Sequence, residues 1–219
     1  MEHTSHKFGP IIFQYEIDDK VFLQKILFEG KNMNIKMNEF LAGQIEDEFQ
    51  FTYDLRQEIE NKLNPYIHDY IDKLNNSKGG YDIKNYKPSI TDCWVNIQKK
   101  NEVNPPHNHS GHISFVFYVQ VPEEIKNEIN KTKSFDPGSI NFMYSHGNDF
   151  RDISNKFNDN VNNILRPTTV KSFIPYEGLL FIFPAYLSHY VEPFKSDNVE
   201  RISIAGNYII IDSTKKGII

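Results

Sequence analysis

The sequence predicts a mainly β protein in which helices near the N-terminus precede a sandwich or barrel of antiparallel strands. First, 17 Phe and 12 Tyr bring the aromatic share of the 219 residues to 14%, and such residues suit sheet surfaces. Second, the apolar spacing changes from period 3.6 to period 2 after the turn-rich segment "NNSKGGYD". Third, short apolar stretches then alternate with Gly, Pro, Asn and Asp clusters, which favours a sandwich or barrel over a parallel α/β sheet.

The N-terminal part contains one predicted strand and two predicted helices. The stretch "IIFQYEI" (Ile11–Ile17) reads as a strand. Asp18 is the expected N-cap of a helix that ends near Gly30. Apolar residues recur at three- and four-residue spacing from about Thr52 to Leu74, which predicts a second helix, and Pro65 should kink it or divide it in two.

The second half supplies the predicted strands. They are "SITDCWVNIQ", "HISFVFYVQV", "GSINFMY", "VKSFI", "GLLFIF", "HYVEPF" and "RISIAGNYIIID". We expect one domain over 1–219, with a strand and supporting helices in 1–80 and the β core in 88–212. The polar, Asn-rich segment 145–169 is too long for a hairpin, and we expect it to be a lid that orders over a bound substrate.

Bulk properties narrow the partners and the location. The net charge is −5 and the lysines are scattered, so we expect no nucleic-acid partner. No window approaches the ~20 apolar residues of a membrane span, and the N-terminus lacks a secretory signal pattern. The single cysteine, Cys93, excludes an internal disulfide and fits a reducing compartment, so we expect a cytoplasmic protein. The oligomeric state stays open.

Three histidines lie close to two of the predicted strands. In "PPHNHSGHISFVFYVQV", His107 and His109 are two positions apart, so in an extended segment their imidazoles point to one face. His189 follows a short turn in "GLLFIFPAYLSHYVEP", and a hairpin there can bring it opposite the other two. An isolated H-x-H pair is more often a pair of surface histidines, but a third histidine at this place favours a metal site.

Arg201 and Ser203 share one face of the last predicted strand by the same period of two. An arginine on the inward face of an apolar strand requires an anionic partner. Glu200 should point to the opposite face, which leaves two readings open. Arg201 could bind a ligand carboxylate, or it could form a structural salt bridge with a distant Asp or Glu.

These motifs resemble a known family. "WVNI", "HNHSGHISFVFYVQVP", "GLLFIFPAYLSHYVEP" and "ERISIAGN" look like the iron(II)- and 2-oxoglutarate-dependent oxygenases, in particular a bacterial and phage branch that also carries a segment like Leu41–Glu46. The resemblance spans about residues 90–210. It implies a double-stranded β-helix, that is, a cupin-like jelly roll, with Fe(II) as cofactor and 2-oxoglutarate as cosubstrate. It further implies a dioxygenase, by default a hydroxylase, whose substrate is a small molecule or a peptidyl group that the sequence does not specify.

Carried over residue by residue, the resemblance makes His107 and His189 iron ligands. It makes Arg201 the partner of the distal carboxylate of 2-oxoglutarate, with Ser203 as a hydrogen-bond donor. The sequence departs from the family pattern at His109, which stands where the family usually has Asp or Glu. We assign His109 as the third ligand, since it lies two positions from His107. This gives a site of three histidines, the expected catalytic and metal-binding set.

Other residues are weaker candidates. Asn96 and Tyr118 could contact 2-oxoglutarate, although packing is the default for a tyrosine in so aromatic a chain. Trp94 shares a face with Asn96 and is at least as well explained as core. The remaining candidates, ranked lower, are Tyr186 as a hydrogen-bond donor, His146 near substrate, and His112 as a ligand.

Two other functions compete with an oxygenase. A cupin-type metal enzyme could use the same histidines without 2-oxoglutarate, but cupins usually place a Glu shortly after H-x-H, where this chain reads "SGHIS". A non-catalytic jelly-roll binding module is the other alternative. Neither requires an inward arginine at the position of Arg201, which favours the oxygenase.

Overall fold

The computed structural model describes residues 3–7, 9–75, 86–128, 136–144 and 170–212. The helices in these residues are α1 (Lys20–Lys31), α2 (Tyr53–Asn75) and α3 (Glu123–Glu128). The strands are β1 (Thr4–Lys7), β2 (Ile11–Glu16), β3 (Asp47–Gln50), β4 (Tyr86–Gln98), β5 (Asn104–His107), β6 (Ile113–Gln120), β7 (Ile140–Met143), β8 (Val170–Phe173), β9 (Leu179–Pro184), β10 (Ser188–Val191) and β11 (Arg201–Asp212).

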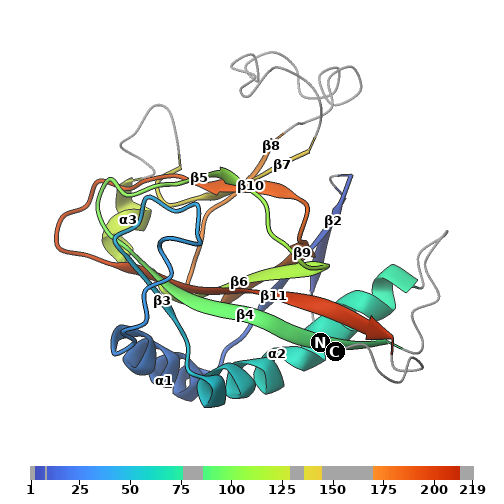
Figure 1. The fold of residues 1–219 in the computed structure, drawn as a ribbon. Helices are drawn as coiled ribbons and strands as arrows, with labels where there is room; N and C mark the ends of the chain where they lie inside the picture. The colour runs from blue at the N-terminus through green and yellow to red at the C-terminus, as the bar shows by residue number, and fades with distance from the viewer. Residues whose placement is uncertain (1–2, 8, 76–85, 129–135, 145–169, 213–219) are drawn as a thin grey trace, which may run out of the picture.

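The strands form two antiparallel sheets that face each other, so the predicted jelly-roll architecture is confirmed. The larger sheet has the order β1-β2-β9-β6-β11-β4-β3, and the smaller one has the order β5-β10-β7-β8. In Figure 1, α1 and α2 cover the outer face of the larger sheet, and the smaller sheet lies across its other face. Several pairs join strands that are distant in sequence, and β11 lies between β4 and β6.

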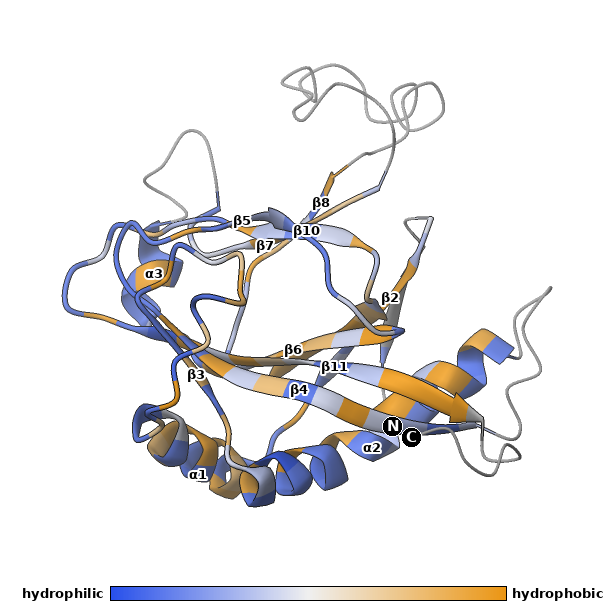
Figure 2. Ribbon diagram, in the orientation of Figure 1, coloured by the Kyte–Doolittle hydropathy of each residue, from blue (hydrophilic) through white to orange (hydrophobic). Residues whose placement is uncertain are grey.

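Two apolar clusters hold these layers together. The first joins α1 and α2 to the larger sheet and includes Ile26, Ile59, Leu63 and Phe117, all fully buried. The second lies between the two sheets, where Phe142 of β7 contacts the rings of Phe181 and Phe183 on β9 of the facing sheet. Figure 2 shows that α1 and α2 combine hydrophobic and hydrophilic residues, as expected for helices that cover one face of a sheet.

The N-terminal elements correct three sequence expectations. The N-cap of α1 is Asp19 rather than Asp18, because the side chain of Asp19 accepts a hydrogen bond from the backbone N–H of Phe22 at 3.0 Å. Pro65 does not divide α2, which runs from Tyr53 to Asn75 with the proline inside. The strand β3 was not predicted, so strands also occur between the helices.

The turn before β9 depends on a glycine. Gly178 has a φ of +86°, and a Cβ there would lie 2.8 Å from the carbonyl oxygen of Ile17. The N–H of Gly178 donates to the backbone carbonyl of Tyr118, and the carbonyl of Gly178 accepts from the backbone N–H of Ile17, both at 2.9 Å. These two hydrogen bonds hold the turn in place. This turn therefore links the ends of β2, β6 and β9.

We expect Gly178→Ala to lower the free energy of unfolding by about 1–3 kcal/mol, because the alanine adds both backbone strain and a close contact. Denaturant unfolding measures this difference. The exposed neighbour Glu177 supplies the control, since Glu177→Ala should stay within about 0.5 kcal/mol of the unmodified protein. Equal stabilities of the two variants would contradict the strain argument.

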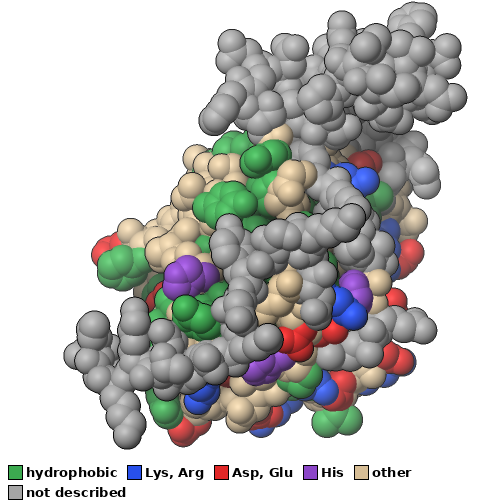
Figure 3. All heavy atoms as spheres, turned by 90° about the vertical axis from the view of Figure 1, so that its right-hand side faces the viewer, with side chains coloured by type: hydrophobic (Ala, Val, Ile, Leu, Met, Phe, Trp, Pro, Cys, Tyr) green, Lys and Arg blue, Asp and Glu red, His purple; other side chains and the backbone are tan. Residues whose placement is uncertain are grey.

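Three further expectations concern the distribution of charge, membrane-spanning helices and the predicted lid. On the face that Figure 3 shows, the described acidic and basic side chains are interspersed rather than gathered by sign. Within the described ranges, no helix combines the length and the hydrophobicity that a membrane-spanning segment requires. The segment 145–169, with His146, lies outside the described residues, so the lid stays a prediction.

Candidate metal and cosubstrate site

The structure brings His107, His109 and His189 together. Their ligand atoms lie within 4.8 Å of one another. Strand pairing explains this, because β5 and β10 are antiparallel neighbours with His107 opposite His189. His109 follows β5 and is anchored by its backbone N–H, which donates to the carbonyl of Ala185 at 2.9 Å. His189 thus faces the other two histidines as expected, but not through a hairpin, because β9 and β10 lie in different sheets and the turn between them crosses from one sheet to the other.

Backbone carbonyls orient two of the three imidazoles. Nδ1 of His107 lies 2.7 Å from the carbonyl oxygen of Pro105, and Nδ1 of His189 lies 2.9 Å from that of Leu187. A carbonyl only accepts, so each Nδ1 carries the proton and each Nε2 carries the lone pair. Nε2 of His109 lies 3.2 Å from Nε2 of His189. Fixing the far nitrogen of a histidine in this way is typical of metal ligands.

Burial keeps the three imidazoles neutral. It lowers the pKa of His107, and it lowers the pKa of His109 to about 3, with repulsion from His107 as the second cause. The pKa of His189 falls well below its ordinary value, first through burial and then through the other two histidines. A metal ligand must be deprotonated, so these residues have the form that a metal requires without a large proton penalty.

Arg201 lines the same cavity, and it is a buried cation to which the described residues supply no counter-charge. Its side chain is 2% exposed, and Nη1 donates to the carbonyl of Gly138. Nε has no hydrogen-bond partner, and no carboxylate of the described residues lies within 4.0 Å of the guanidinium. Glu200 instead pairs with Lys31 on the outer side, as its position predicted. Among the described residues, the structural salt bridge left open by the sequence is absent.

Tyr118 supports Arg201 from β6. The guanidinium carbon of Arg201 lies 5.4 Å from the centre of the Tyr118 ring, and the fully buried Tyr118 hydroxyl has no partner among the described residues. Burial raises the pKa of that hydroxyl against the opposing effect of Arg201, so it stays a neutral donor. A buried cation without an anionic partner and a buried hydroxyl without a hydrogen-bond partner among the described residues fit an acidic ligand group.

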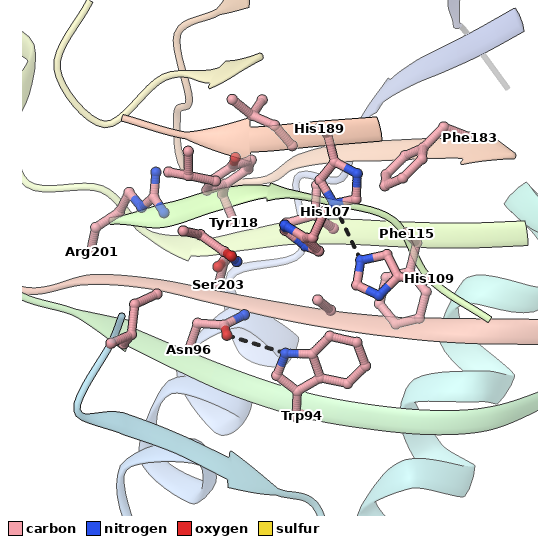
Figure 4. Close-up of a pocket in the computed structure, with 16 residues that line it drawn as sticks. Trp94, Asn96, His107, His109, Phe115, Tyr118, Phe183, His189, Arg201 and Ser203 are labelled. Carbon is pink, nitrogen blue, oxygen red and sulfur yellow. Dashed lines mark hydrogen bonds between the residues drawn. The ribbon is translucent and has the colours of Figure 1, made fainter. Parts of the chain in front are cut away.

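Figure 4 shows the cavity with the histidines at its centre and Arg201 at one side. Asn96 and Ser203 lie between them and are directly opposite each other in the β4–β11 pair. Every residue assigned to the site from the sequence therefore lines one cavity. The full lining set adds Ile45, Trp94, Asn104, Phe115, Val116, Ile140, Phe183, Val191 and Ala205.

The lower-ranked candidates lie elsewhere. Nδ1 of His112 accepts from the backbone N–H of Ile210 at 2.8 Å, and His112 does not line the cavity. Tyr186 is 64% exposed and is also not part of the lining. Sequence reasoning missed Asn104 and Ile45 as lining residues. For Ile45 a signal existed, since it lies in the Leu41–Glu46 segment that resembled the oxygenase branch.

One buried acid lies next to the site. Glu48 is fully buried on β3, directly opposite Asn96 of β4, and its Oε1 has no hydrogen-bond partner among the described residues. Burial raises the pKa of Glu48 to about 7, and repulsion from Glu102 acts in the same direction. The folded protein thus holds a proton here that the unfolded chain releases near pH 4.5.

Below about pH 4.5 the carboxyl of Glu48 is neutral in both the folded and the unfolded protein, and its contribution to stability is fully present. That contribution is lost as the pH rises through about 7, because the buried carboxyl then has to ionise. We therefore expect Glu48→Gln to gain about 1–3 kcal/mol over the unmodified protein at pH 8 and little at pH 5. Urea unfolding at both values measures the difference, and contributions from the histidines cancel between the two proteins. Glu177→Gln, at an exposed position, is the control. A gain that is the same at both pH values would contradict the assignment.

Comparisons with known proteins agree with this site. A family model described as "Putative 2OG-Fe(II) oxygenase" matches residues 92–207, which is more than half of the chain and contains all three histidines and Arg201. The chain belongs to the 2OG-Fe(II) oxygenase family. It is therefore an oxidoreductase of the class that uses Fe(II) and 2-oxoglutarate. No curated protein matches the chain.

Solved structures confirm the fold. A prolyl-4-hydroxylase from Pseudomonas putida is 12% identical, with a TM-score of 0.52 over 90% of this chain and 91% of that one. A prolyl hydroxylase from Trichoplax adhaerens, solved with a hypoxia inducible factor oxygen degradation domain peptide fragment, is 15% identical. Its TM-score is 0.53 over 95% of this chain and 86% of that one. At these identities the likeness extends to the fold alone.

Proposed function

We propose that this protein is a dioxygenase that binds Fe(II) through His107, His109 and His189 and hydroxylates a substrate C–H bond. One observation carries the proposal most directly. Three neutral imidazoles converge in the same cavity as Arg201, a buried cation with no carboxylate partner among the described residues. Imidazole nitrogen is a suitable donor for iron, and the protein would hold the metal from one side, leaving the other side for ligands.

The cavity fits 2-oxoglutarate by the chemistry of its unpaired groups. Arg201 would bind the distal carboxylate through its guanidinium fork, while the hydroxyls of Tyr118 and Ser203 donate to the same group. The amide of Asn96 would donate to an oxygen nearer the histidines. When bound, iron and 2-oxoglutarate supply the oxidising power for hydroxylation by O₂, with decarboxylation of the keto acid.

The apolar walls exclude water from the reacting groups. Val116, Ile140, Phe183 and Ala205 line the cavity beside the polar residues, and Ile140 and Phe183 are each only 1% exposed. A dry cavity strengthens the attraction between Arg201 and a carboxylate, because the local dielectric is low. The protein thus contributes position, charge and the exclusion of solvent.

Uncoupled turnover tests the proposal without knowledge of the substrate. We expect the purified protein, given Fe(II), O₂ and 2-oxoglutarate, to release succinate and CO₂ slowly. The control is the same protein with iron removed by a chelator. If iron binds but succinate never exceeds this control, the cupin-type alternative without 2-oxoglutarate becomes the better account. Membership of an oxygenase family already disfavours a non-catalytic binding module.

Substitutions at His109 test the third ligand. We expect His109→Ala to weaken iron retention, whereas His109→Asp should preserve or strengthen it, because a carboxylate adds charge and competes less with protons. Some 2-oxoglutarate turnover should survive in the Asp variant. Asn108→Asp places the same charge on the exposed neighbour and serves as the matched control. Iron retention by His109→Ala equal to that of the unmodified protein would refute the assignment.

The class of substrate and the cellular location are also proposals. A small molecule or a peptidyl group is favoured over a nucleic acid by the net charge of −5 and the scattered lysines. We also propose a cytoplasmic location. The single cysteine, Cys93, supports it, because this residue is a buried free thiol whose pKa is raised by burial.

A further inference from the structure

The amide of Asn96 has a defined orientation. Nε1 of Trp94 lies 3.1 Å from Oδ1 of Asn96, and the two side chains are only 4% and 7% exposed. An indole N–H can only donate, so the atom that it contacts must be the acceptor end of the amide. Hydrogen-bond chemistry alone therefore sets the flip of this amide.

This orientation leaves the donor end of Asn96 for the cavity. Nδ2 makes no hydrogen bond to any described residue, and Figure 4 shows the amide next to Ser203 and below His107, with Trp94 on its other side. Arg201, Tyr118 and Ser203 also offer donors to this part of the cavity. The dianion of 2-oxoglutarate contains only acceptor oxygens, so a donor here attracts it, whereas an exposed amide oxygen would repel it.

We propose that Trp94 is a positioning residue that directs the N–H donors of Asn96 toward 2-oxoglutarate by occupying the amide oxygen. Trp94 then acts through Asn96 rather than on the ligand itself. This inference rests on the proposed function, because it takes 2-oxoglutarate as the ligand. It differs from simple packing of Trp94, since packing requires the indole ring but not the indole N–H.

The test is the affinity for 2-oxoglutarate, measured by calorimetry on the Fe(II)-loaded protein without oxygen, so that no turnover is needed. Trp94→Phe keeps an aromatic ring and removes the N–H. We expect it to weaken 2-oxoglutarate binding about 3- to 10-fold, the size of one neutral hydrogen bond. Phe117→Leu removes core volume from a buried ring that does not line the cavity and should leave the affinity unchanged.

A double-mutant cycle separates positioning from packing. If Trp94 acts through Asn96, adding Trp94→Phe to Asn96→Ala should weaken binding no further than Asn96→Ala alone. Additive losses, or an unchanged affinity in Trp94→Phe, would overturn the inference.

A second variant keeps the idea testable if Trp94→Phe does not fold. Asn96→Asp keeps the acceptor for the indole but presents oxygen to the cavity, so it should bind 2-oxoglutarate more weakly than Asn96→Ala. Affinity of Asn96→Asp equal to that of the unmodified protein would overturn the inference. The proposed function would fail differently, through absence of 2-oxoglutarate binding in the unmodified protein, and the inference would fall with it.

Discussion

Replacing His107 and His189 together by alanine should abolish iron binding and, with it, turnover of 2-oxoglutarate. The two side chains supply Nε2 atoms whose direction is fixed by the carbonyls of Pro105 and Leu187. In this variant only His109 remains, and a single imidazole competes poorly with water as a ligand of a divalent metal. Loss of an outer partner of a metal ligand costs about 10- to 100-fold, so loss of two ligands should cost well over about 100-fold.

Iron content per chain, measured after anaerobic loading and removal of unbound metal, checks this expectation. The matched control is His112→Ala, a histidine from the same segment whose Nδ1 accepts from Ile210 rather than facing the cluster. It should retain iron. Full occupancy in the double variant would show that the iron binds elsewhere.

The second large effect is expected at Arg201. Arg201→Ala removes the cationic partner of the distal carboxylate, and the loss of one partner of a buried charge pair costs roughly 2–5 kcal/mol. The affinity for 2-oxoglutarate should therefore fall at least about 30-fold. Iron binding should persist, because none of the three histidines depends on Arg201 for a hydrogen bond.

Calorimetry on the Fe(II)-loaded protein without oxygen measures this effect. Arg56→Ala is the control, since Arg56 is a partly buried arginine that donates to the carbonyl of Thr91 on the helix side of the larger sheet. Its removal could lower stability and should leave the affinity unchanged. An unchanged affinity in Arg201→Ala would contradict the cosubstrate assignment.

The parts of the site that lie on regular strands were predictable from the sequence. A period of two places Arg201 and Ser203 on one face, and the structure finds both in the cavity. The apolar stretch before His189 and the turn that follows this stretch predicted a return of the chain toward His107, and β10 does place His189 opposite His107, although β9 and β10 lie in different sheets and form no hairpin. Side-chain direction on a strand follows from spacing alone, which is why these residues could be grouped without a structure.

Residues in irregular or very short segments could not be found in this way. Ile45 lies between α1 and β3, and Asn104 begins the four-residue strand β5, so neither has a period to show its direction. The choice between Asp18 and Asp19 as N-cap depends on one hydrogen bond that two adjacent aspartates could each form. Of the two effects expected of Pro65, division of the helix did not occur, because tertiary packing of α2 outweighs local propensity.

The contact between Trp94 and Asn96 is a feature that strand periodicity does not predict. Spacing placed both side chains on one face of β4, but whether the indole packs as core or hydrogen-bonds the amide depends on rotamers that the sequence does not specify. The same holds for Glu48, whose burial arises from pairing with β4 and from cover by the segment around Gly43. The burial of Glu48 thus depends on β4, a strand distant from it in sequence.

The central claim is that three histidines hold the iron, and anomalous scattering at the iron absorption edge tests it most directly. Crystals of the protein loaded with Fe(II) without oxygen should show one anomalous peak within bonding distance of the imidazoles of His107, His109 and His189. A peak elsewhere, or a peak beside His107 and His189 with His109 turned away, would contradict the three-histidine site.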